Sequence, residues 1–141
     1  MGKRREGREA AVQFLFQHDL NAGTQAEMEA AFWELRPSTK NVRDFSDALI
    51  KGVIANKAAI DERIQKYTAN YELHRIAVVD RNILRVAIYE MLFCNDVPPV
   101  VSINEAIEIA KRYGAEESGR FVNGILDRVK LDLTRPSRTT S

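Results

Sequence analysis

Four basic side chains crowd the first turns of the chain, at Lys3, Arg4, Arg5 and Arg8. The planar guanidinium of arginine can bind a phosphate through two hydrogen bonds and can stack on an unpaired base, which suits single-stranded RNA. Two carboxylates, Glu6 and Glu9, interrupt the run. Because each phosphate contact releases counterions, so small a cluster predicts modest, salt-sensitive RNA binding. A solvated N-terminus that only promotes solubility is the alternative interpretation.

The overall charge of the chain does not indicate nucleic-acid binding. The 141 residues carry 21 Lys and Arg against 20 Asp and Glu, so the formal net charge is only +1. A second basic group recurs near the other end, at Arg128, Lys130, Arg135 and Arg138. If the two ends lie close together, a nearly neutral protein can still carry a basic patch. A partner that completes the site would compensate for weak unaided binding.

The residue types that usually carry catalysis or hold metals are sparse. Cys94 is the only cysteine, so it cannot form an intramolecular disulfide, and His18 and His74 have no companion at metal-site or catalytic-triad spacing. The two glycines of 119–124 have the spacing of a phosphate-binding loop, but Ile and Leu replace the required lysine and hydroxyl. We therefore expect no enzyme activity, no metal and no cofactor.

Length and hydrophobic content favour a folded, cytoplasmic protein. Hydrophobic residues make up 45% of the chain, which is ample for one domain or for two small bundles that share a core. The longest apolar run is far shorter than the roughly 20 residues that span a bilayer. The basic N-terminus also lacks the apolar segment of a signal peptide, so no membrane association is expected.

Glycine and proline are few and no strand-like alternation stands out, which predicts an all-α fold. We expect Ser38 or Asn41 to cap the third helix. The helix near the middle has apolar residues on more than one face, which is typical of a central helix contacted from several sides. The predicted helices cover about residues 5–20, 26–35, 42–53, 56–67, 73–93, 102–113 and 117 onward.

The last two helices have recognisable start and stop signals. Pro98 and Pro99 end the preceding helix. Ser102 and Glu105 have the spacing of a capping box, which predicts a helix start at Ser102. Gly114 follows a basic pair and is expected to adopt a left-handed C-cap conformation.

Three segments together resemble the NusB family of small helical transcription antitermination factors. These are the opening REGREAAVQFLFQ at 5–17, DRNILRVAIYEM at 80–91, and VPPVVSINEAIEIAKRYGAEESGRFVNGILD at 97–127. The match covers nearly the whole chain. It implies about seven helices in two stacked three-helix-type bundles that share a central helix. Residues 1–133 would form this RNA-binding domain, and the polar residues 134–141 a disordered tail.

The same resemblance implies which residues contact RNA. The basic cluster matches the family's arginine-rich segment, and Phe16 stands where relatives often have tyrosine, so its ring lacks the phenolic hydroxyl. Asp80 and Glu117 fall at acidic positions that can accept hydrogen bonds from base amino groups; an ion pair and a favourable charge near a helix N-terminus are their structural alternatives. The complete implied set is Lys3, Arg4, Arg5, Arg8, Phe16, Tyr67, Asp80, Glu117, Arg120 and Phe121.

The function implied is non-enzymatic. A NusB-like protein would bind the boxA element of ribosomal RNA transcripts together with the small-subunit ribosomal protein NusE, within an RNA polymerase antitermination complex. One alternative is a fragment related to the N-terminal helical domain of some ribosomal RNA cytosine methyltransferases, although no glycine-rich cofactor turn or catalytic cysteine motif occurs here. The other alternative is a helical protein-interaction module whose basic ends have no role in RNA binding.

Overall fold

The computed structural model describes residues 2–21, 23–68 and 72–134, and within these ranges every regular element is a helix, which confirms the all-α prediction. A short 3₁₀ helix, η1 (Leu73–Arg75), precedes the central helix. The seven α-helices are α1 (Gly2–Leu20), α2 (Gln25–Leu35), α3 (Lys40–Ala55), α4 (Lys57–Lys66), α5 (Val78–Phe93), α6 (Pro99–Tyr113) and α7 (Ser118–Thr134).

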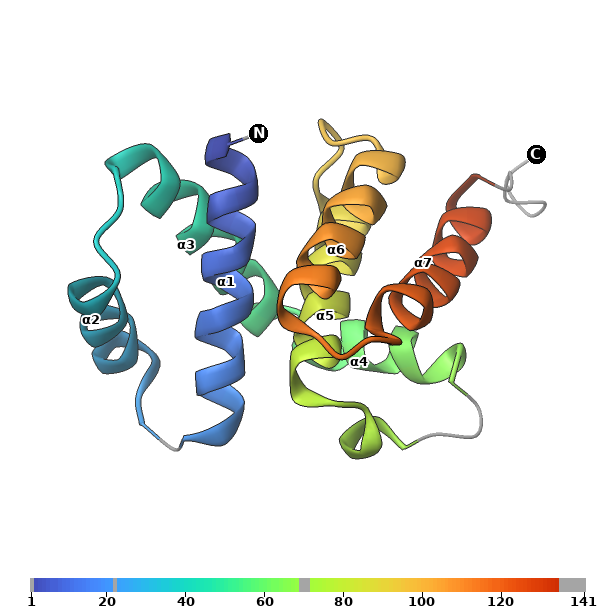
Figure 1. Cartoon of the computed structure of the whole chain (residues 1–141), viewed down its shortest axis with the longest axis horizontal. Helices are drawn as coiled ribbons and strands as arrows, with labels where there is room; N and C mark the ends of the chain where they lie inside the picture. Colours follow the sequence, from blue (N-terminus) through green and yellow to red (C-terminus); the bar gives the residue numbers. More distant parts are fainter. Residues whose placement is uncertain (1, 22, 69–71, 135–141) are drawn as a thin grey trace.

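The helices form two groups around α5 (Figure 1). Helices α1, α2 and α3 lie together on one side, and α4, α6 and α7 on the other. Helix α5 packs against α1, α3, α4, α6 and α7, so it is the shared central helix that the sequence predicts. Figure 1 also shows that α6 stands between α1 and α7, which separates the two basic ends of the described chain.

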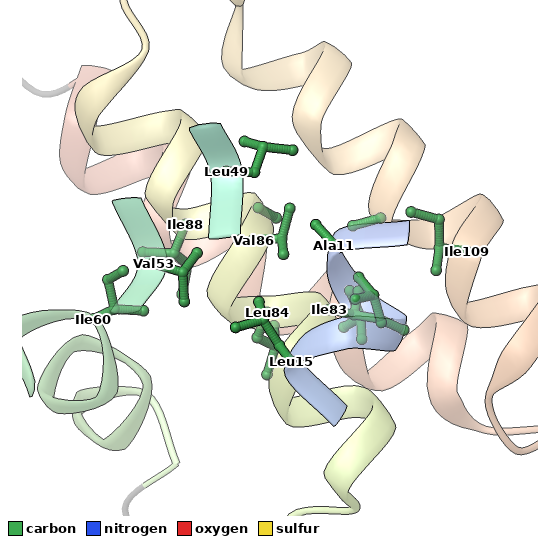
Figure 2. Packing of buried hydrophobic residues seen from close by; sticks show 14 of the residues in the cluster. Ala11, Leu15, Leu49, Val53, Ile60, Ile83, Leu84, Val86, Ile88 and Ile109 are labelled. Atoms are coloured by element: carbon green, nitrogen blue, oxygen red, sulfur yellow. The ribbon is translucent and has the colours of Figure 1, made fainter. Parts of the chain in front are cut away.

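Buried aliphatic side chains join the two groups into one core. Figure 2 shows Ile83, Leu84, Val86 and Ile88 of α5 among side chains from four other helices. Each fully buried side chain of this size contributes roughly 1.5–3 kcal/mol to the stability of the fold. The partners labelled there are Ala11 and Leu15 of α1, Leu49 and Val53 of α3, Ile60 of α4 and Ile109 of α6.

A charged network fixes the C-terminal end of α1 to α4 and α5. Asp19 accepts hydrogen bonds from Arg85 Nη1 (2.7 Å) and Asn82 Nδ2 (3.0 Å), while Arg85 also donates to both oxygens of Asp61 (2.7 and 2.9 Å). Burial raises the pKa of Asp19, but the bond from Asn82 and the charges of Arg85 and Lys57 outweigh it and lower this pKa overall. Asp19 therefore stays ionised and holds α1 in place.

Two predicted helix starts are wrong. The central helix begins at Val78 rather than Leu73, because residues 73–75 form η1 and Ala77 has extended dihedral angles (φ −52°, ψ 139°). Neither Ser38 nor Asn41 caps α3; Thr39 does, and its hydroxyl accepts from the backbone N–H of Val42.

The predicted capping box and left-handed glycine are also wrong. Helix α6 begins at Pro99, whose fixed φ suits a first helical position. Ser102 is therefore inside the helix, where its hydroxyl donates to Glu90 Oε1 (3.3 Å). Gly114 has φ −94°, so handedness does not require glycine there. A Cβ at this position would lie 2.5 Å from Ser118 Oγ, so a close approach between α6 and α7 explains the glycine instead.

Several predictions concern what the chain lacks. Among the described residues, no helix is long and apolar enough to cross a membrane, and no group of three or more His, Cys, Asp or Glu side chains could hold a metal ion. The predicted tail lies outside the described residues except for Thr134, which is the last residue of α7.

Candidate nucleic-acid interface

At the N-terminal end of α1, an ion pair engages Arg5. Its Nε and Nη2 donate to the two oxygens of Glu105 on α6, each at 2.8 Å. These hydrogen bonds and the charge of the carboxylate raise the pKa of Arg5, and the same bonds lower the pKa of Glu105. A phosphate that binds Arg5 must compete with Glu105.

Arg8 is withdrawn from the surface completely. It donates three hydrogen bonds to Glu90 of α5, from Nε at 2.9 and 3.1 Å and from Nη2 at 2.9 Å. The side chain of Arg8 is 4% exposed and that of Glu90 is 1% exposed. Arg8 therefore has a structural role here. Its spacing contained a signal for this, because Arg8 stands four residues before Val12 and seven before Leu15, on the apolar stripe of α1.

Two cations at this end remain open to solvent. Lys3 is exposed. Arg4 is 58% exposed, lies 3.9 Å from Asp96, and has its guanidinium 5.1 Å from the centre of the Phe45 ring. Gly7 permits this arrangement, since a Cβ there would lie 2.5 Å from a carbon of the Phe45 ring. The exposed basic surface is thus smaller than four neighbouring basic residues suggest.

The second basic group does not extend this surface. Arg128 donates from Nη1 to the backbone oxygen of Tyr67 (3.4 Å), so it lies against the end of α4 and not against α1. Arg135 and Arg138 lie outside the described residues. Among the residues that are described, the combined basic patch does not form.

A hollow of about 220 Å³ lies where the start of α5 meets the start of α7. It brings together three of the predicted RNA-binding residues, Asp80, Glu117 and Phe121. Asp80 is 8% exposed, and its Oδ1 has no hydrogen-bond partner among the described residues. The other residues that line the hollow are Arg75, Ile76, Ala77, Ala115 and Ser118.

This hollow has the chemistry of a base-binding site. A buried carboxylate oxygen without a partner is costly, so it is a strong acceptor for any donor that enters. The exocyclic amino groups of nucleobases are such donors, and the Phe121 ring beside the carboxylate offers a surface for stacking. The alternative for Asp80 is its position in the first turn of α5, where a negative charge is favourable.

Glu117 and Arg120 form an exposed ion pair at the rim of the hollow. Arg120 Nη1 lies 3.3 Å from Glu117 Oε1, and both side chains are largely exposed. Arg120 also lines an adjoining open hollow of about 450 Å³ with Lys111 and Asn123. An exposed pair of this kind contributes little to stability, so both groups can exchange partners with a ligand.

The two remaining predicted aromatics lie apart from this hollow. Phe16 lines a separate groove between α1 and the end of α6. Tyr67 is the C-cap residue of α4, where Lys66 Nζ lies 5.5 Å from the centre of its ring. Its buried hydroxyl has no partner among the described residues. The predicted residues therefore lie in three kinds of place: the basic N-terminal end of α1, the hollow between α5 and α7, and two separate aromatic positions, Phe16 and Tyr67.

Sequence reasoning missed the acidic partners that decide which cations are available. Glu90 lies 82 positions from Arg8, and Glu105 lies 100 positions from Arg5. No local pattern could connect them.

Comparisons with known proteins identify the family and the fold. The model of the NusB family matches residues 5–130. The transcription antitermination protein NusB of Sorangium cellulosum is 44% identical over 98% of this chain and 99% of its own length. Among solved structures, T. maritima NusB has a TM-score of 0.80 and 43% identity, covering 92% of this chain and 91% of that one. Antitermination factors NusB and NusE in complex with dsRNA give a TM-score of 0.85 at 25% identity, covering 94% of this chain and 98% of that one.

Proposed function

This chain belongs to the NusB family of transcription antitermination factors, and we propose that it binds the boxA element of ribosomal RNA transcripts together with the ribosomal protein NusE. On this proposal it is a cytoplasmic, non-enzymatic factor that works within an RNA polymerase antitermination complex. The relative solved with NusE and RNA supports this combination of partners.

The observation that carries the RNA-binding part is the unpartnered Oδ1 of Asp80 in a hollow lined by Phe121. In the proposal, Asp80 accepts from a base amino group and Phe121 stacks on the base. Glu117 adds a second acceptor at the rim, where Arg120 can reach a phosphate. Because carboxylates repel phosphates, these acceptors serve the choice of sequence more than the total affinity.

Phosphate contacts come from the basic end. Lys3 and Arg4 are exposed, and Arg5 can contribute if it exchanges Glu105 for a phosphate. We leave Arg8 out of the proposed contacts because Glu90 binds it inside the fold. Tyr67 remains in the proposed set on its family position alone.

With only two exposed cations and one hollow available, the protein alone should bind RNA with modest affinity. A partner that contacts both protein and RNA adds its own binding energy, so each pairwise interaction can be weak while the ternary complex is strong. NusE is the proposed partner.

The proposal is tested by fluorescence anisotropy of a labelled boxA RNA and a scrambled RNA of equal length, each with and without NusE. We expect selective binding to boxA that tightens at least about tenfold with NusE, roughly 1.4 kcal/mol of coupling. Equal affinity for the two RNAs in both conditions would contradict the proposal and leave a helical interaction module with another partner.

A further inference from the structure

The walls of the base-binding hollow come from two places in the fold. One wall includes Ser118 and Phe121 of α7. The other includes Asp80 of α5 and residues 75–77, which belong to the η1–α5 junction at 73–77. The position of the Asp80 carboxylate relative to the Phe121 ring therefore depends on where this junction lies.

The local sequence fixes this junction only weakly. Ala77, the N-cap residue of α5, has no side-chain oxygen with which to cap the first turn that carries Asp80. The preceding η1 is three residues long, and its start also has no side-chain cap among the described residues. Because so short a helix has few internal hydrogen bonds, contacts from elsewhere in the fold must hold it in place.

Arg81 supplies such a contact. Its Nη1 donates to the backbone oxygen of Leu73 in η1 (3.1 Å) and to that of Ile76, the C-cap residue of η1 (3.4 Å). Its Nη2 donates to Asp19 Oδ2 on α1 (3.4 Å). The side chain of Arg81 is 12% exposed, so these bonds lie largely out of water. The guanidinium thus joins the junction to α1 through charge-assisted hydrogen bonds, which are stronger than those between neutral groups.

The carboxylate that anchors Arg81 is itself held firmly. Asp19 also accepts hydrogen bonds from Asn82 (3.0 Å) and Arg85 (2.7 Å), one and four residues after Arg81 on α5. Lys57 of α4 donates to the other oxygen of Asp19 (3.3 Å), and it makes no hydrogen bond to η1 among the described residues. Arg81 and Lys57 therefore share one acidic partner, but only Arg81 links that partner to the junction.

We propose that Arg81 is a positioning residue for RNA selection, which holds the η1–α5 junction against α1 and so keeps the Asp80 carboxylate in place beside Phe121. Arg81 itself contacts no RNA in this role. The inference rests on the base-binding role proposed above for Asp80 and adds the residue that fixes its position. Because a binding group must be held within about 0.5 Å of its working position, a small displacement of the junction is enough to lose selection.

The test measures the affinities of Arg81→Gln for boxA RNA and for scrambled RNA, in the full chain with NusE present. The ratio of the two affinities should fall about 2- to 12-fold, which corresponds to the loss of one hydrogen bond between Asp80 and the base. The slope of log affinity against log salt should stay as in the wild type, because Arg81 neutralises no phosphate.

Lys57→Gln is the matched control. It removes the same charge and one cation partner of Asp19, but it leaves both bonds from Arg81 to the junction in place. Its affinity ratio should equal that of the wild type. Arg81→Lys keeps the charge but loses the planar guanidinium that reaches both sides, so it should recover the ratio only in part. Circular dichroism should show equal helix content in all three variants.

Amide hydrogen exchange tests the hold on the junction without RNA. The backbone N–H groups of Arg75 and Ile76 donate to Glu72 (2.9 Å) and Leu73 (3.1 Å). In Arg81→Gln these two groups should exchange faster than in the wild type or in the control, because the junction opens more often. Equal exchange rates in all of these proteins would show that Arg81 does not hold the junction.

The outcomes separate this inference from the proposed function. If Arg81→Gln keeps the wild-type ratio while Asp80→Asn lowers it, the inference is refuted and the function stands. If Lys57→Gln lowers the ratio equally, or Arg81→Lys restores it fully, charge alone explains the effect and the positioning role is refuted. A salt slope shallower by about 0.7 in Arg81→Gln would make Arg81 a phosphate contact instead. If wild-type protein with NusE does not select boxA, both proposals fail.

A second variant covers the case in which Arg81→Gln does not fold. Arg81→Lys is then compared with Lys57→Gln in the same assays. A lower affinity ratio in Arg81→Lys alone supports the positioning role, and wild-type ratios in both variants refute it.

Discussion

The N-terminal turns of α1 carry four basic side chains, whereas the surface near its other end carries aromatic rings, amides and a buried carboxylate. At the basic end, Glu105 and Glu90 engage Arg5 and Arg8 through bidentate pairs. Near the other end, the buried Oδ1 of Asp80 has no hydrogen-bond partner among the described residues.

This difference shows that a basic residue counted in the sequence is not always available to bind a ligand. Much of the basic end is used to join α1 to α5 and α6. At the opposite end, Asp80 Oδ1 has no partner among the described residues, and burial makes it a stronger and more selective hydrogen-bonding site. On the proposed function, the first region supplies general phosphate attraction and the second supplies the choice of RNA sequence.

The largest effect is expected on stability from Glu90→Gln. This variant removes the carboxylate that is hydrogen-bonded to the buried Arg8 guanidinium and leaves it only the more distant Glu105, whose Oε1 lies 3.9 Å from Arg8 Nη1. The free energy of unfolding, measured with urea, should fall by about 3 kcal/mol. Asp44→Asn, which disrupts the exposed Lys40–Asp44 pair, is the control and should cost less than about 1 kcal/mol. A Glu90→Gln protein as stable as that control would show that the Arg8 pair does not hold α1 in place.

A smaller effect is expected on RNA binding from Lys3→Gln combined with Arg4→Gln. The slope of log affinity against log salt should become shallower by about 0.7 for each phosphate that the variant no longer neutralises. The matched control replaces Arg5 and Glu105 together by glutamine, which removes one paired cation without changing the net charge. If the control flattens the slope as much as the first variant, Arg5 is also an available cation.

The smallest effect is expected on acid stability. Because the folded pKa of Glu105 is lowered, its ion pair stabilises the protein above the ordinary pKa of 4.5, and this contribution disappears as the pH falls below that value through the folded pKa. Urea unfolding across this range should show a weaker pH dependence for Glu105→Gln than for the wild type. Identical pH profiles would mean that the pair contributes nothing to stability.

The sequence predicted the helices well because amphipathic spacing is a local property. The stripe that includes Val12 and Leu15 is buried as expected, and apolar residues on several faces of 73–93 correctly indicated a central helix. Helix starts were less predictable, since Ser102 and Glu105 have the spacing of a cap but form tertiary bonds to Glu90 and Arg5 instead.

The candidate site was predictable only in part. The family resemblance named Asp80, Glu117 and Phe121, and the fold brings them to one hollow. It also named Arg8, whose burial depends on Glu90 in a distant helix. The groove beside Phe16 was not predicted, because Val79 and Tyr113 reach it from helices that are remote in sequence.

The most direct test of the central claim compares Asp80→Asn with the Lys3→Gln and Arg4→Gln double variant, using boxA and scrambled RNA in the presence of NusE. The account predicts that Asp80→Asn reduces the ratio of the two affinities, while the double variant weakens binding to both RNAs by the same factor. An unchanged ratio in Asp80→Asn, or a ratio that falls in the double variant, would contradict the division of roles between the two regions.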